Sequence, residues 1–377
     1  MKINNCIVCG ENSFEILFHS PKSMSSDMRI LPIEIKKEGC TYCGFVRSTS
    51  TEFLEGFYKN DYTLNNENLD PIQIYKGQKF KRSELIFDWI MDFISKDKVF
   101  MSSFDSVIEI GCGSGNLLER FKRKKLFGIE PNKTSFDICS QKFPSENILF
   151  EELSEKIKFD LVISVCVIEH TINPLLFLEK CKNILADEGY IVLILPIQDL
   201  KSYDPFFLDH LHHFSRNHII NLLDTLNLQC VNSELGYKCI EDQGVFFIKK
   251  RDQLTANNLE RFKNKNFEYG KSIINKTNIF LEKQMVLNKK IIAFGYGERS
   301  FFLQAYAQLE NYIEFYIDDV KTNKYSVKSF SQFSNEVDFD ESLIILLLIN
   351  PHYNKFIIDK FSVYNDIIFL NPFEYEK

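Results

Sequence analysis

Four cysteines near the start of the chain form two pairs of equal spacing. Cys6 and Cys9 make the first Cys-x2-Cys pair, Cys40 and Cys43 make the second, and a glycine follows each pair directly. Each pair can present two thiolates on one tight turn, and two such knuckles supply the four ligands of a tetrahedral zinc site. Four protein ligands leave no open coordination position, so the pattern predicts a structural zinc ion that stabilises a small domain. Chance burial and a redox Cys-x-x-Cys pair are the alternatives.

A glycine-rich segment follows a short apolar run, Val107–Ile110, and reads Gly111-Cys-Gly-Ser-Gly-Asn116. Alternate glycines let the backbone pass close to a ligand at the carboxyl end of the first strand of an open α/β sheet. Glu109 lies within that strand, and Glu130 closes the next predicted strand, where an acid can accept both hydroxyls of a ribose. Dinucleotide enzymes use Gly-x-Gly-x-x-Gly instead, and a carboxylate in the strand would repel a pyrophosphate. The segment therefore favours a cationic or hydroxyl-rich ligand.

Histidines gather after the fifth predicted strand. Four of the seven histidines fall between residues 210 and 218, within and just after the segment Asp209-His-Leu-His-His-Phe-Ser215. Near-neutral bases at the mouth of a site suit proton abstraction. A metal site is less convincing, because matching ligands elsewhere are not evident, and packing or capping of a helix over 217–226 is the alternative for each histidine. Glu169 and His170, after the fourth strand, are either structural support or direct ligands.

Alternating strands and helices must position these residues. Strands are predicted at Val107–Ile110, Leu126–Glu130, Phe159–Val165 and Tyr190–Leu195, with a helix over 78–95 before them and a helix starting at Leu117–Phe121. This alternation implies a largely parallel sheet covered by helices on both faces. A polar, helical connector is expected over 251–290. A second alternation, with strands at 291–295, 314–317, 343–349 and 367–370, predicts a smaller α/β domain.

The whole chain has the composition of a globular protein. Its 377 residues are 45% hydrophobic and 26% charged, and the length suggests two or three domains. The net charge of −7 argues against nucleic acid as the main partner. The sequence begins without the apolar run of a signal peptide, no stretch has the roughly 18 apolar residues of a membrane span, and the ten cysteines are expected to be reduced. We expect a cytoplasmic protein.

On these motifs the sequence resembles the class I S-adenosylmethionine (SAM)-dependent methyltransferases. The residues 109–115 are similar to the first motif of that superfamily, Glu130 to its ribose-binding acid, 159–170 to its fourth strand and following loop, and 184–196 to the turn before its fifth strand. The resemblance implies SAM as the cofactor. It also implies the following cofactor-binding residues: Glu109, Gly111, Cys112, Gly113, Gly115, Asn116, Glu130, Pro131, Val165 and Tyr62.

The order of the motifs resembles the three-domain C-methyltransferases that act on nucleotide-linked 4-keto-deoxy sugars. This resemblance implies a zinc-binding domain (1–62), a Rossmann-like SAM-dependent methyltransferase domain (63–250), and a helical connector with a second Rossmann-like domain (251–377). The family's Tyr-His-Glu-His pattern corresponds here to Phe207-Leu-Asp-His210, without the tyrosine and the first histidine. The match implies that His210 is the base that generates an enolate, that Asp209 orients it, and that His213 is the next candidate.

The C-terminal segment Phe294-Gly-Tyr-Gly-Glu-Arg-Ser300 carries Ser300 where a dinucleotide site has its third glycine. It also departs from the family's Gly-Ala-x-x-Lys-Gly. We expect this domain to help enclose the acceptor, with Arg299 or the backbone of 295–297 near a phosphate; an inert structural domain is the alternative. The rival functions are an O-methyltransferase on a sugar or other small metabolite, a nicotinamide-dependent oxidoreductase and a zinc-ribbon adaptor. The expected partner is a small molecule, with no nucleic acid and no membrane, and a monomer is favoured.

Overall fold

The structure is a computed structural model, and it describes residues 5–49, 51, 57–58, 70–123, 125–251, 266–286, 289–319, 327–336, 343–362, 364 and 367–374. The predicted cofactor residue Tyr62 lies outside the described residues. The chain divides into two compact units. The first consists of Met1–Phe18, Lys36–Pro205 and Asp209–Asn266, and the second of His19–Ile35, Phe206–Leu208 and Phe267–Lys377.

A seven-stranded sheet forms the centre of the first unit, in the order β10-β9-β8-β11-β12-β15-β14. Its strands are β8 (Ser106–Ile110), β9 (Lys125–Ile129), β10 (Ser145–Glu146), β11 (Phe159–Val165), β12 (Leu185–Pro196), β14 (Leu228–Tyr237) and β15 (Ile240–Lys250). The first five strands in that order pair in parallel, whereas β15 pairs antiparallel with β12 and β14. The predicted parallel sheet is confirmed, and it carries the carboxyl ends of β8, β9, β11 and β12 at one edge.

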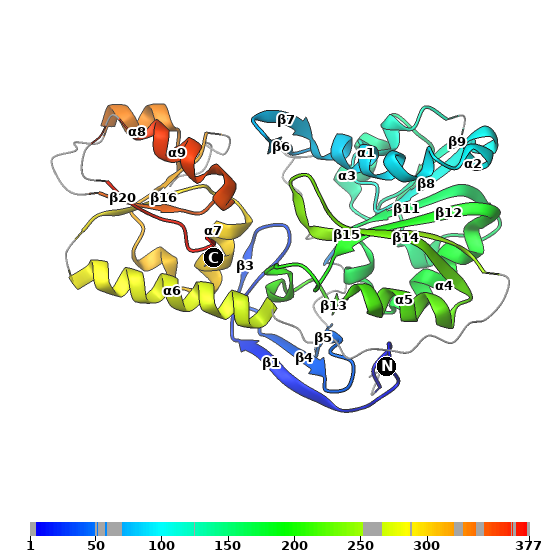
Figure 1. The fold of residues 1–377 in the computed structure, drawn as a ribbon, viewed down its shortest axis with the longest axis horizontal. Helices are drawn as coiled ribbons and strands as arrows, with labels where there is room; N and C mark the ends of the chain where they lie inside the picture. The colour runs from blue at the N-terminus through cyan, green and yellow to red at the C-terminus, as the bar shows by residue number, and fades with distance from the viewer. Residues whose placement is uncertain are drawn as a thin grey trace. The chain divides into compact units, whose positions relative to one another are not determined.

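Helices cover both faces of this sheet. They are α1 (Arg82–Ile94), α2 (Lys98–Ser103), α3 (Lys133–Cys139), α4 (Pro174–Ile184) and α5 (Arg216–Thr225). Neighbouring strand residues point to opposite faces, so Val107 packs in the cluster that contains α1, and Ile108 packs in the cluster that contains α4 and α5. Figure 1 shows α1 on one side of the strands and α4 and α5 on the other.

Two helices are shorter than the sequence predicts. The helix expected from residue 78 begins at Arg82, because Lys76 and Gly77 have φ of 50° and 78° and close a hairpin between β6 (Ile72–Tyr75) and β7 (Gln78–Lys81). The helix expected from Leu117 is a single turn, Leu118–Arg120, and extended backbone follows it at Phe121. Few residues remain there before β9 begins, and so short a segment cannot sustain a longer helix.

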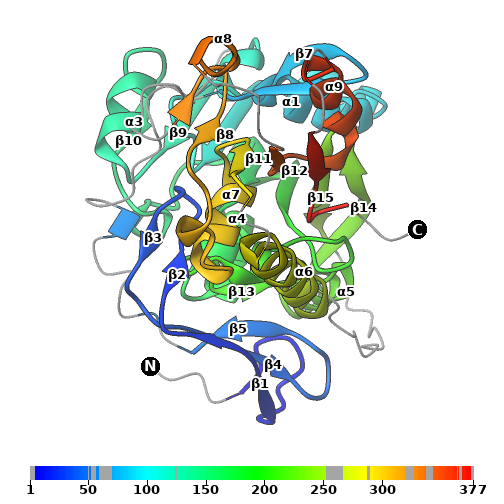
Figure 2. The ribbon, with the colours of Figure 1, turned by 90° about the vertical axis from the view of Figure 1, so that its left-hand side faces the viewer.

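A second sheet in the order β1-β4-β5-β13 carries the cysteine knuckles. It contains β1 (Phe14–Ser20), β4 (Ile35–Cys40), β5 (Val46–Ser48) and β13 (His212–His213). Figure 2 shows β1, β4 and β5 as neighbouring strands. Since β13 belongs to the segment after β12, this small sheet joins the N-terminal knuckles to the histidine-rich segment within the first unit.

The second unit is built on a parallel five-stranded sheet in the order β18-β17-β16-β19-β20. Its strands are β16 (Ile291–Phe294), β17 (Tyr316–Ile317), β18 (Val327–Lys328), β19 (Ile344–Leu347) and β20 (Ile368–Leu370), so the predicted second alternation is confirmed. The helices are α6 (Asn266–Val286), α7 (Glu298–Tyr306), α8 (Phe330–Glu336) and α9 (Asn354–Lys360), and a ribbon of β2 (Ser23–Met24) and β3 (Ile30–Leu31) belongs to the same unit. Among the described helices, none is both long and apolar enough to cross a membrane.

The predicted C-terminal loop lies between β16 and α7. Gly295 has a φ of 102°, and the Tyr296 amide donates to Asp318 at 2.9 Å. The guanidinium of Arg299 lies over the ring of Phe373, 5.4 Å from its centroid. The loop therefore has the backbone shape of a glycine turn, while the role of Arg299 toward a phosphate stays a prediction.

Candidate active site

The glycine loop turns over the ends of two neighbouring strands. The amides of Gly111 and Cys112 both donate to the carbonyl of Ile129, at 2.8 and 3.0 Å, so the loop is tied to the end of β9. Gly111, Gly113 and Gly115 all have a left-handed backbone, with φ of 70°, 54° and 77°. A side chain on Gly113 would meet nothing within 4 Å, so its backbone borders open space. The predicted close approach of a ligand to this backbone fits that geometry.

Glu130 is held rigidly at the end of β9. Its carboxylate accepts from the Gly113 amide and from the Asn132 amide, both at 2.8 Å. Burial raises the pKa of Glu130, and the two amides oppose that shift. Each carboxylate oxygen has a second lone pair, so the group can also accept from vicinal hydroxyls of a ribose.

Glu109 is a buried acid with an unused oxygen. Its side chain is 5% exposed, and Oε2 has no hydrogen-bond partner among the described residues. Burial raises the pKa of Glu109 well above its usual range. Such a group is satisfied when a ligand brings a donor or a positive charge. Together with Glu130 and the open Gly113 backbone, it fits SAM, which carries an amino group, a ribose and a sulfonium.

The other predicted cofactor residues surround this loop. Cys112 Sγ lies 3.5 Å from Cys139 Sγ, and Asn116 donates to Ser114 Oγ at 2.8 Å. The Pro131 carbonyl accepts from the Asn147 side chain at 2.9 Å. Val165 ends β11, which lies beside β8 in the sheet. The structure thus places all the described members of the predicted set at or near one edge of the sheet, and their binding role stays a prediction.

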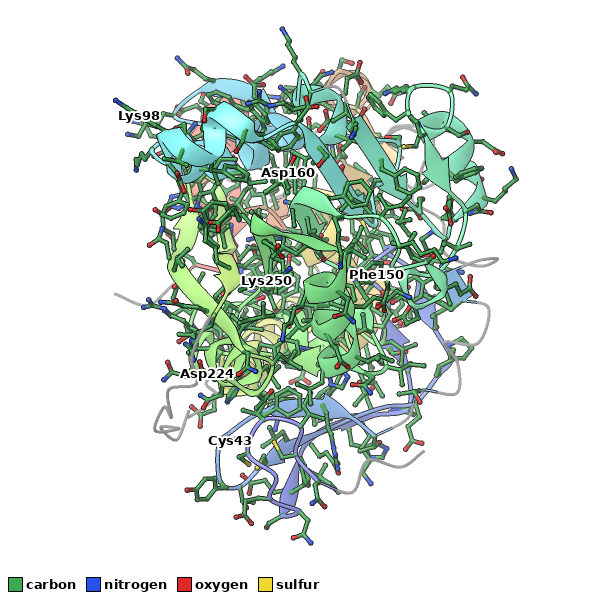
Figure 3. All side chains as sticks on the ribbon, turned by 90° about the vertical axis from the view of Figure 1, so that its right-hand side faces the viewer. Cys43, Lys98, Phe150, Asp160, Asp224 and Lys250 are labelled. Carbon is green, nitrogen blue, oxygen red and sulfur yellow. The ribbon has the colours of Figure 1, made fainter. Side chains whose placement is uncertain are left out.

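The four knuckle cysteines converge. Their sulfur atoms all lie within 4.8 Å of one another, with 3.6 Å between Cys6 and Cys43 and 3.5 Å between Cys9 and Cys40. A tetrahedral site with Zn–S bonds of about 2.3 Å requires sulfur atoms about 3.8 Å apart, so the four thiols fit zinc. Figure 3 labels Cys43 within this region. Gly10 and Gly44, which follow the pairs, have φ of 79° and 78°, as expected for knuckle turns.

His218 links the knuckles to α5. Its Nδ1 accepts from the Ser215 amide at 3.0 Å, so the proton is on Nε2, which donates to the Cys43 carbonyl at 3.0 Å. Burial lowers the pKa of His218 to about 4, which agrees with this neutral form. The predicted alternative of a packing role therefore describes His218.

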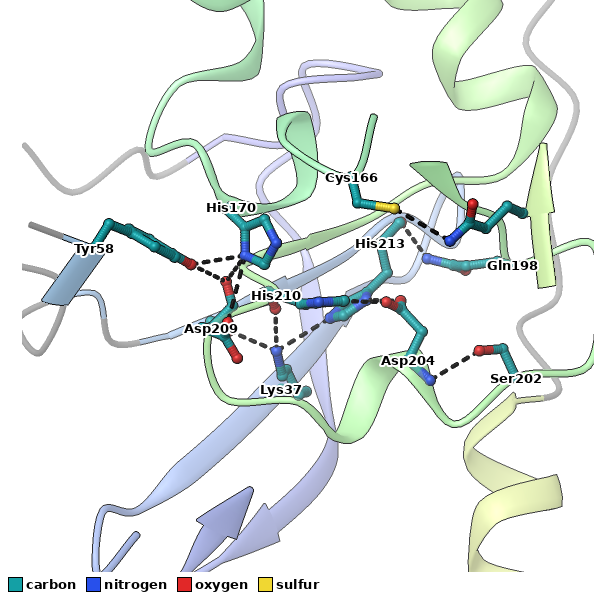
Figure 4. A network of polar contacts seen from close by, with 12 residues as sticks. Lys37, Tyr58, Cys166, His170, Gln198, Ser202, Asp204, Asp209, His210 and His213 are labelled. Atoms are coloured by element: carbon teal, nitrogen blue, oxygen red, sulfur yellow. Dashed lines mark hydrogen bonds and ion pairs between the residues drawn. The ribbon is translucent and has the colours of Figure 1, made fainter. Parts of the chain in front are cut away.

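A buried carboxylate joins the two histidines that the sequence singled out. Asp204, six residues before His210, accepts from His210 Nδ1 through one oxygen and from His213 Nδ1 at 2.5 Å through the other. All three side chains are less than 10% exposed. Figure 4 shows both imidazoles directed at Asp204. The carboxylate fixes Nδ1 as the protonated nitrogen of each ring, so Nε2 of His210 is the atom that can take a further proton.

Lys37, from β4, completes this network. Its ammonium is fully buried and contacts Ser48 Oγ at 2.8 Å, His213 Nε2 at 3.1 Å and the His210 carbonyl. Lys37 donates to Nε2, which requires a lone pair there, so His213 is neutral. Burial and the neighbouring Lys37 lower the pKa of His213 to about 4, in agreement with that state. Burial lowers the pKa of Lys37 itself to about 7, against the effect of Asp204 and Asp209.

The pKa of His210 is raised, in contrast to that of His213. Burial disfavours its charge, but the adjacent Asp204 carboxylate outweighs burial and raises the pKa of His210 to about 9. Burial raises the pKa of Asp204, but the two neighbouring imidazoles outweigh burial and hold that pKa well below its usual range. His210 and Asp204 therefore form a tight ion pair at neutral pH, and the neutral, basic form of His210 is populated as the pH rises.

Asp209 contacts a different histidine. Its carboxylate lies 3.6 Å from His170 Nδ1, and its carbonyl lies 2.9 Å from the same atom. The Tyr58 hydroxyl is 2.7 Å from that Nδ1. Burial lowers the pKa of His170 to about 4. The hydrogen bond that orients the His210 ring thus comes from Asp204, whereas the role predicted for Asp209 stays a prediction.

Sequence reasoning missed Asp204, Lys37 and Tyr58. Asp204 offered one signal, because an acid six residues before the predicted base lies in the same loop after the fifth strand. Lys37 offered none, since it is 173 residues from its His210 contact and lysine is rarely buried.

A comparison with protein families matches residues 78–242 to a methyltransferase domain. This range contains the glycine loop, the acids and the histidines described above. The matched range is less than half of the chain, and the likeness to methyltransferases applies to this range. The strands from β8 to β12, the predicted cofactor edge and β14 lie within the matched range, and β15 begins in it.

Several known proteins are similar to part of this chain. The ubiquinone biosynthesis O-methyltransferase of Rhodopseudomonas palustris (strain TIE-1) is 30% identical over 108 residues, which cover 26% of this chain and 42% of that protein. The one from Bradyrhizobium diazoefficiens is 26% identical over 106 residues, with the same 26% and 42% covered. The chain therefore spans about two fifths of the length of these relatives. A solved SAM-dependent methyltransferase from Archaeoglobus fulgidus is 18% identical, with a TM-score of 0.36, over 44% of this chain and 94% of that one.

Proposed function

We propose that the protein transfers a methyl group from SAM to a carbon atom next to a carbonyl group, in a nucleotide-linked keto-deoxy sugar. The observation that carries this proposal is the buried pair of His210 and Asp204, which follows β12 at the carboxyl edge where the cofactor loop also lies. A base with a fixed tautomer at that edge suits removal of an acidic C–H proton. The four-cysteine cluster and the parallel C-terminal sheet support the three-domain arrangement of the proposed family.

The methyltransferase domain would hold the cofactor with residues that are already placed. Glu130 would accept the ribose hydroxyls, Glu109 would face the methionine end, and the Gly111–Gly115 backbone would lie along the cofactor. SAM supplies an electrophilic methyl group on a sulfonium. The chain itself contributes position: with the acceptor carbon held in line with that methyl group, a bimolecular reaction becomes effectively unimolecular.

His210 would act as the base through Nε2. Asp204 holds Nδ1–H and stabilises the imidazolium that forms when the acceptor's proton arrives. His213 shares the second oxygen of Asp204 and is itself fixed by Lys37, so the carboxylate has little freedom to turn away. The residues Cys6, Cys9, Cys40 and Cys43 would bind a structural zinc ion that takes no part in the chemistry.

The direct test uses SAM labelled with 13C in its methyl group and a panel of nucleotide-linked 4-keto-deoxy sugars. NMR of the product should place the label on carbon next to the carbonyl. His210→Ala should lose transfer, while calorimetric SAM binding survives. Absence of SAM binding in the wild-type protein would refute a methyltransferase role, and label on oxygen would refute the enolate route.

Methylation of a hydroxyl group is the second candidate. The observation in its favour is the match to proteins named as O-methyltransferases of ubiquinone biosynthesis. A histidine base can also deprotonate a hydroxyl, so His210 would serve either reaction. The position of the label distinguishes the two candidates without further assumptions.

A further inference from the structure

Glu169 is a buried acid that the proposed mechanism leaves without a task. It lies in the turn Ile168–His170, which begins three residues after the end of β11, and is 1% exposed. Neither of its carboxyl oxygens meets a hydrogen-bond partner on another residue within the described part of the chain. Buried polar groups in folded proteins are nearly always paired, so a carboxyl group with both oxygens unpaired points to a partner that is not part of the chain.

The position of Glu169 identifies where that partner would lie. The Leu211 amide donates to the Glu169 carbonyl at 2.7 Å, which fixes the turn against the residue that follows His210. A carboxyl oxygen of Glu169 and ring nitrogens of His170 and His210 all lie within 4.8 Å of one another. The rings of His170 and His210 are perpendicular, with centroids 4.6 Å apart. The unpaired acid therefore shares its site with the proposed base.

The backbone before Glu169 is held in an uncommon conformation. Cys166 has a φ of 53°, although it is not glycine, and its amide donates to the Ile194 carbonyl at 2.8 Å. Strain of this kind is concentrated at functional sites. Glu109 is comparable: it lies one residue before the end of the neighbouring strand β8, and it too has an unpaired carboxyl oxygen. Glu109 belongs to the cofactor end, which leaves Glu169 for the acceptor.

Burial keeps Glu169 protonated at neutral pH. Burial raises the pKa of Glu169 to about 8, Asp204 and Asp209 add to the rise, and His210 opposes it. His170 is neutral, because burial lowers its pKa to about 4. Glu169 therefore carries an O–H group, which can donate a hydrogen bond to an oxygen that gains negative charge.

We propose that Glu169 is a catalytic residue that donates a hydrogen bond to the carbonyl oxygen of the acceptor and stabilises the enolate. This role rests on the proposed carbon methylation. The acceptor's C–H bond breaks, its proton goes to His210 Nε2, its electron pair forms the C=C bond, and the carbonyl π pair moves to the oxygen facing Glu169. The enolate pair then forms the new carbon–methyl bond, and sulfur keeps the pair of the broken C–S bond.

Deuterium exchange isolates the proposed step from methyl transfer. The probe is a thymidine diphosphate-linked 4-keto-6-deoxyhexose, incubated in D2O with the protein and S-adenosylhomocysteine, and exchange next to the carbonyl is followed by NMR. Glu169→Ala should slow exchange by about 100-fold, the typical effect of losing one oxyanion donor. Glu169→Gln keeps an N–H donor of the same shape and should stay within about tenfold of the wild type. It should also lose the alkaline fall of the exchange rate that ionisation of Glu169 causes in the wild type.

The outcomes separate the role of Glu169 from the function on which it rests. Calorimetric SAM binding in each variant verifies the fold. Normal exchange in Glu169→Ala overturns the role of Glu169 alone. A Glu169→Gln variant as slow as Glu169→Ala overturns it too, because a neutral hydrogen-bond donor would then be insufficient and the carboxylate charge would be needed. Loss of a bound metal ion from Glu169→Ala relative to wild type also overturns it, in favour of a cation held by Glu169, His170 and His210. Absence of exchange in the wild type overturns both the role and the proposed carbon methylation.

Discussion

Asp204→Asn tests the electrostatics of the acceptor site. The pKa of His210 is raised from 6.5 to about 9. The difference corresponds to about 3.5 kcal/mol in favour of the imidazolium, at about 1.4 kcal/mol for each pH unit. One adjacent opposite charge typically accounts for 1–3 units. With asparagine in place, we expect the pKa of His210 to fall by about 2 units, because burial then acts with less opposition.

The sign of the effect on activity follows from the proposed role of His210 as a base. The base must be neutral, so the rate falls with decreasing pH as His210 gains its proton; it also falls with increasing pH as Glu169, the proposed hydrogen-bond donor, loses its proton. With pKa values of about 9 for His210 and about 8 for Glu169, wild-type activity should be highest between about pH 8 and 9 and decline on both sides, and in Asp204→Asn the acidic decline should begin at lower pH. The maximal rate should still fall, by about 100-fold, because asparagine holds the ring less firmly and does not stabilise the imidazolium.

Histidine NMR gives the pKa directly and needs no acceptor. The chain has seven histidines, so selective 13C labelling yields a small set of ring signals, and His210→Ala assigns the one of interest. Asp209→Asn is the matched control, since Asp209 lies 3.6 Å from His170 Nδ1. The reasoning is refuted when Asp209→Asn moves the His210 titration as far as Asp204→Asn does, or when the His210 pKa of the Asp204→Asn variant is unchanged.

Three further variants test the other parts of the site. Cys43→Ser should abolish binding of about one zinc ion per chain, seen by elemental analysis, and lower the Tm; unchanged zinc content would exclude the four-cysteine site. Gly113→Val should weaken SAM binding at least about tenfold in calorimetry, because its side chain enters the open space at a φ of 54°, whereas equal affinity would place the cofactor elsewhere. Lys37→Met removes the donor to His213 and should slow exchange roughly tenfold with unchanged SAM affinity, while full activity would remove Lys37 from the site.

The cofactor edge could be predicted from the sequence because its determinants are local. The strand with Glu109, the three glycines and the acid that closes the next strand lie within 22 consecutive residues, 109–130, and each has a direct physical reason. Strand periodicity likewise predicted β11 at its observed bounds, Phe159–Val165. The turn before α1 was harder to predict. The hairpin at Lys76 and Gly77 takes the place of the first turn of the helix expected from residue 78, although the apolar residues of the expected helix are at helical spacing.

The acceptor site could be predicted only in part, because its decisive contacts join distant segments. His210 and His213 were found from their density in the sequence, but the carboxylate that both imidazoles share depends on how the loop after β12 folds back. Lys37 lies on β4, which pairs with β5, and β5 in turn pairs with β13. These pairings bring Lys37 to the site, but strands as short as β5 and β13 show no sequence periodicity from which to predict them. A buried lysine also contradicts the ordinary preference of that residue, so composition gave no reason to consider it.

These long-range contacts connect the cysteine knuckles to the proposed acceptor site. β5 follows directly on Cys43 and pairs His213 with Val46, and His218 donates to the Cys43 carbonyl. Metal binding that orders the knuckles would thereby order the strand that bears His213 and, through Asp204, the ring of His210. A zinc ion bound there would influence the proposed catalysis without touching the substrate. Its removal is then expected to lower the rate of proton abstraction before it affects the affinity for SAM, whose predicted ligands lie on β8, β9 and their loops.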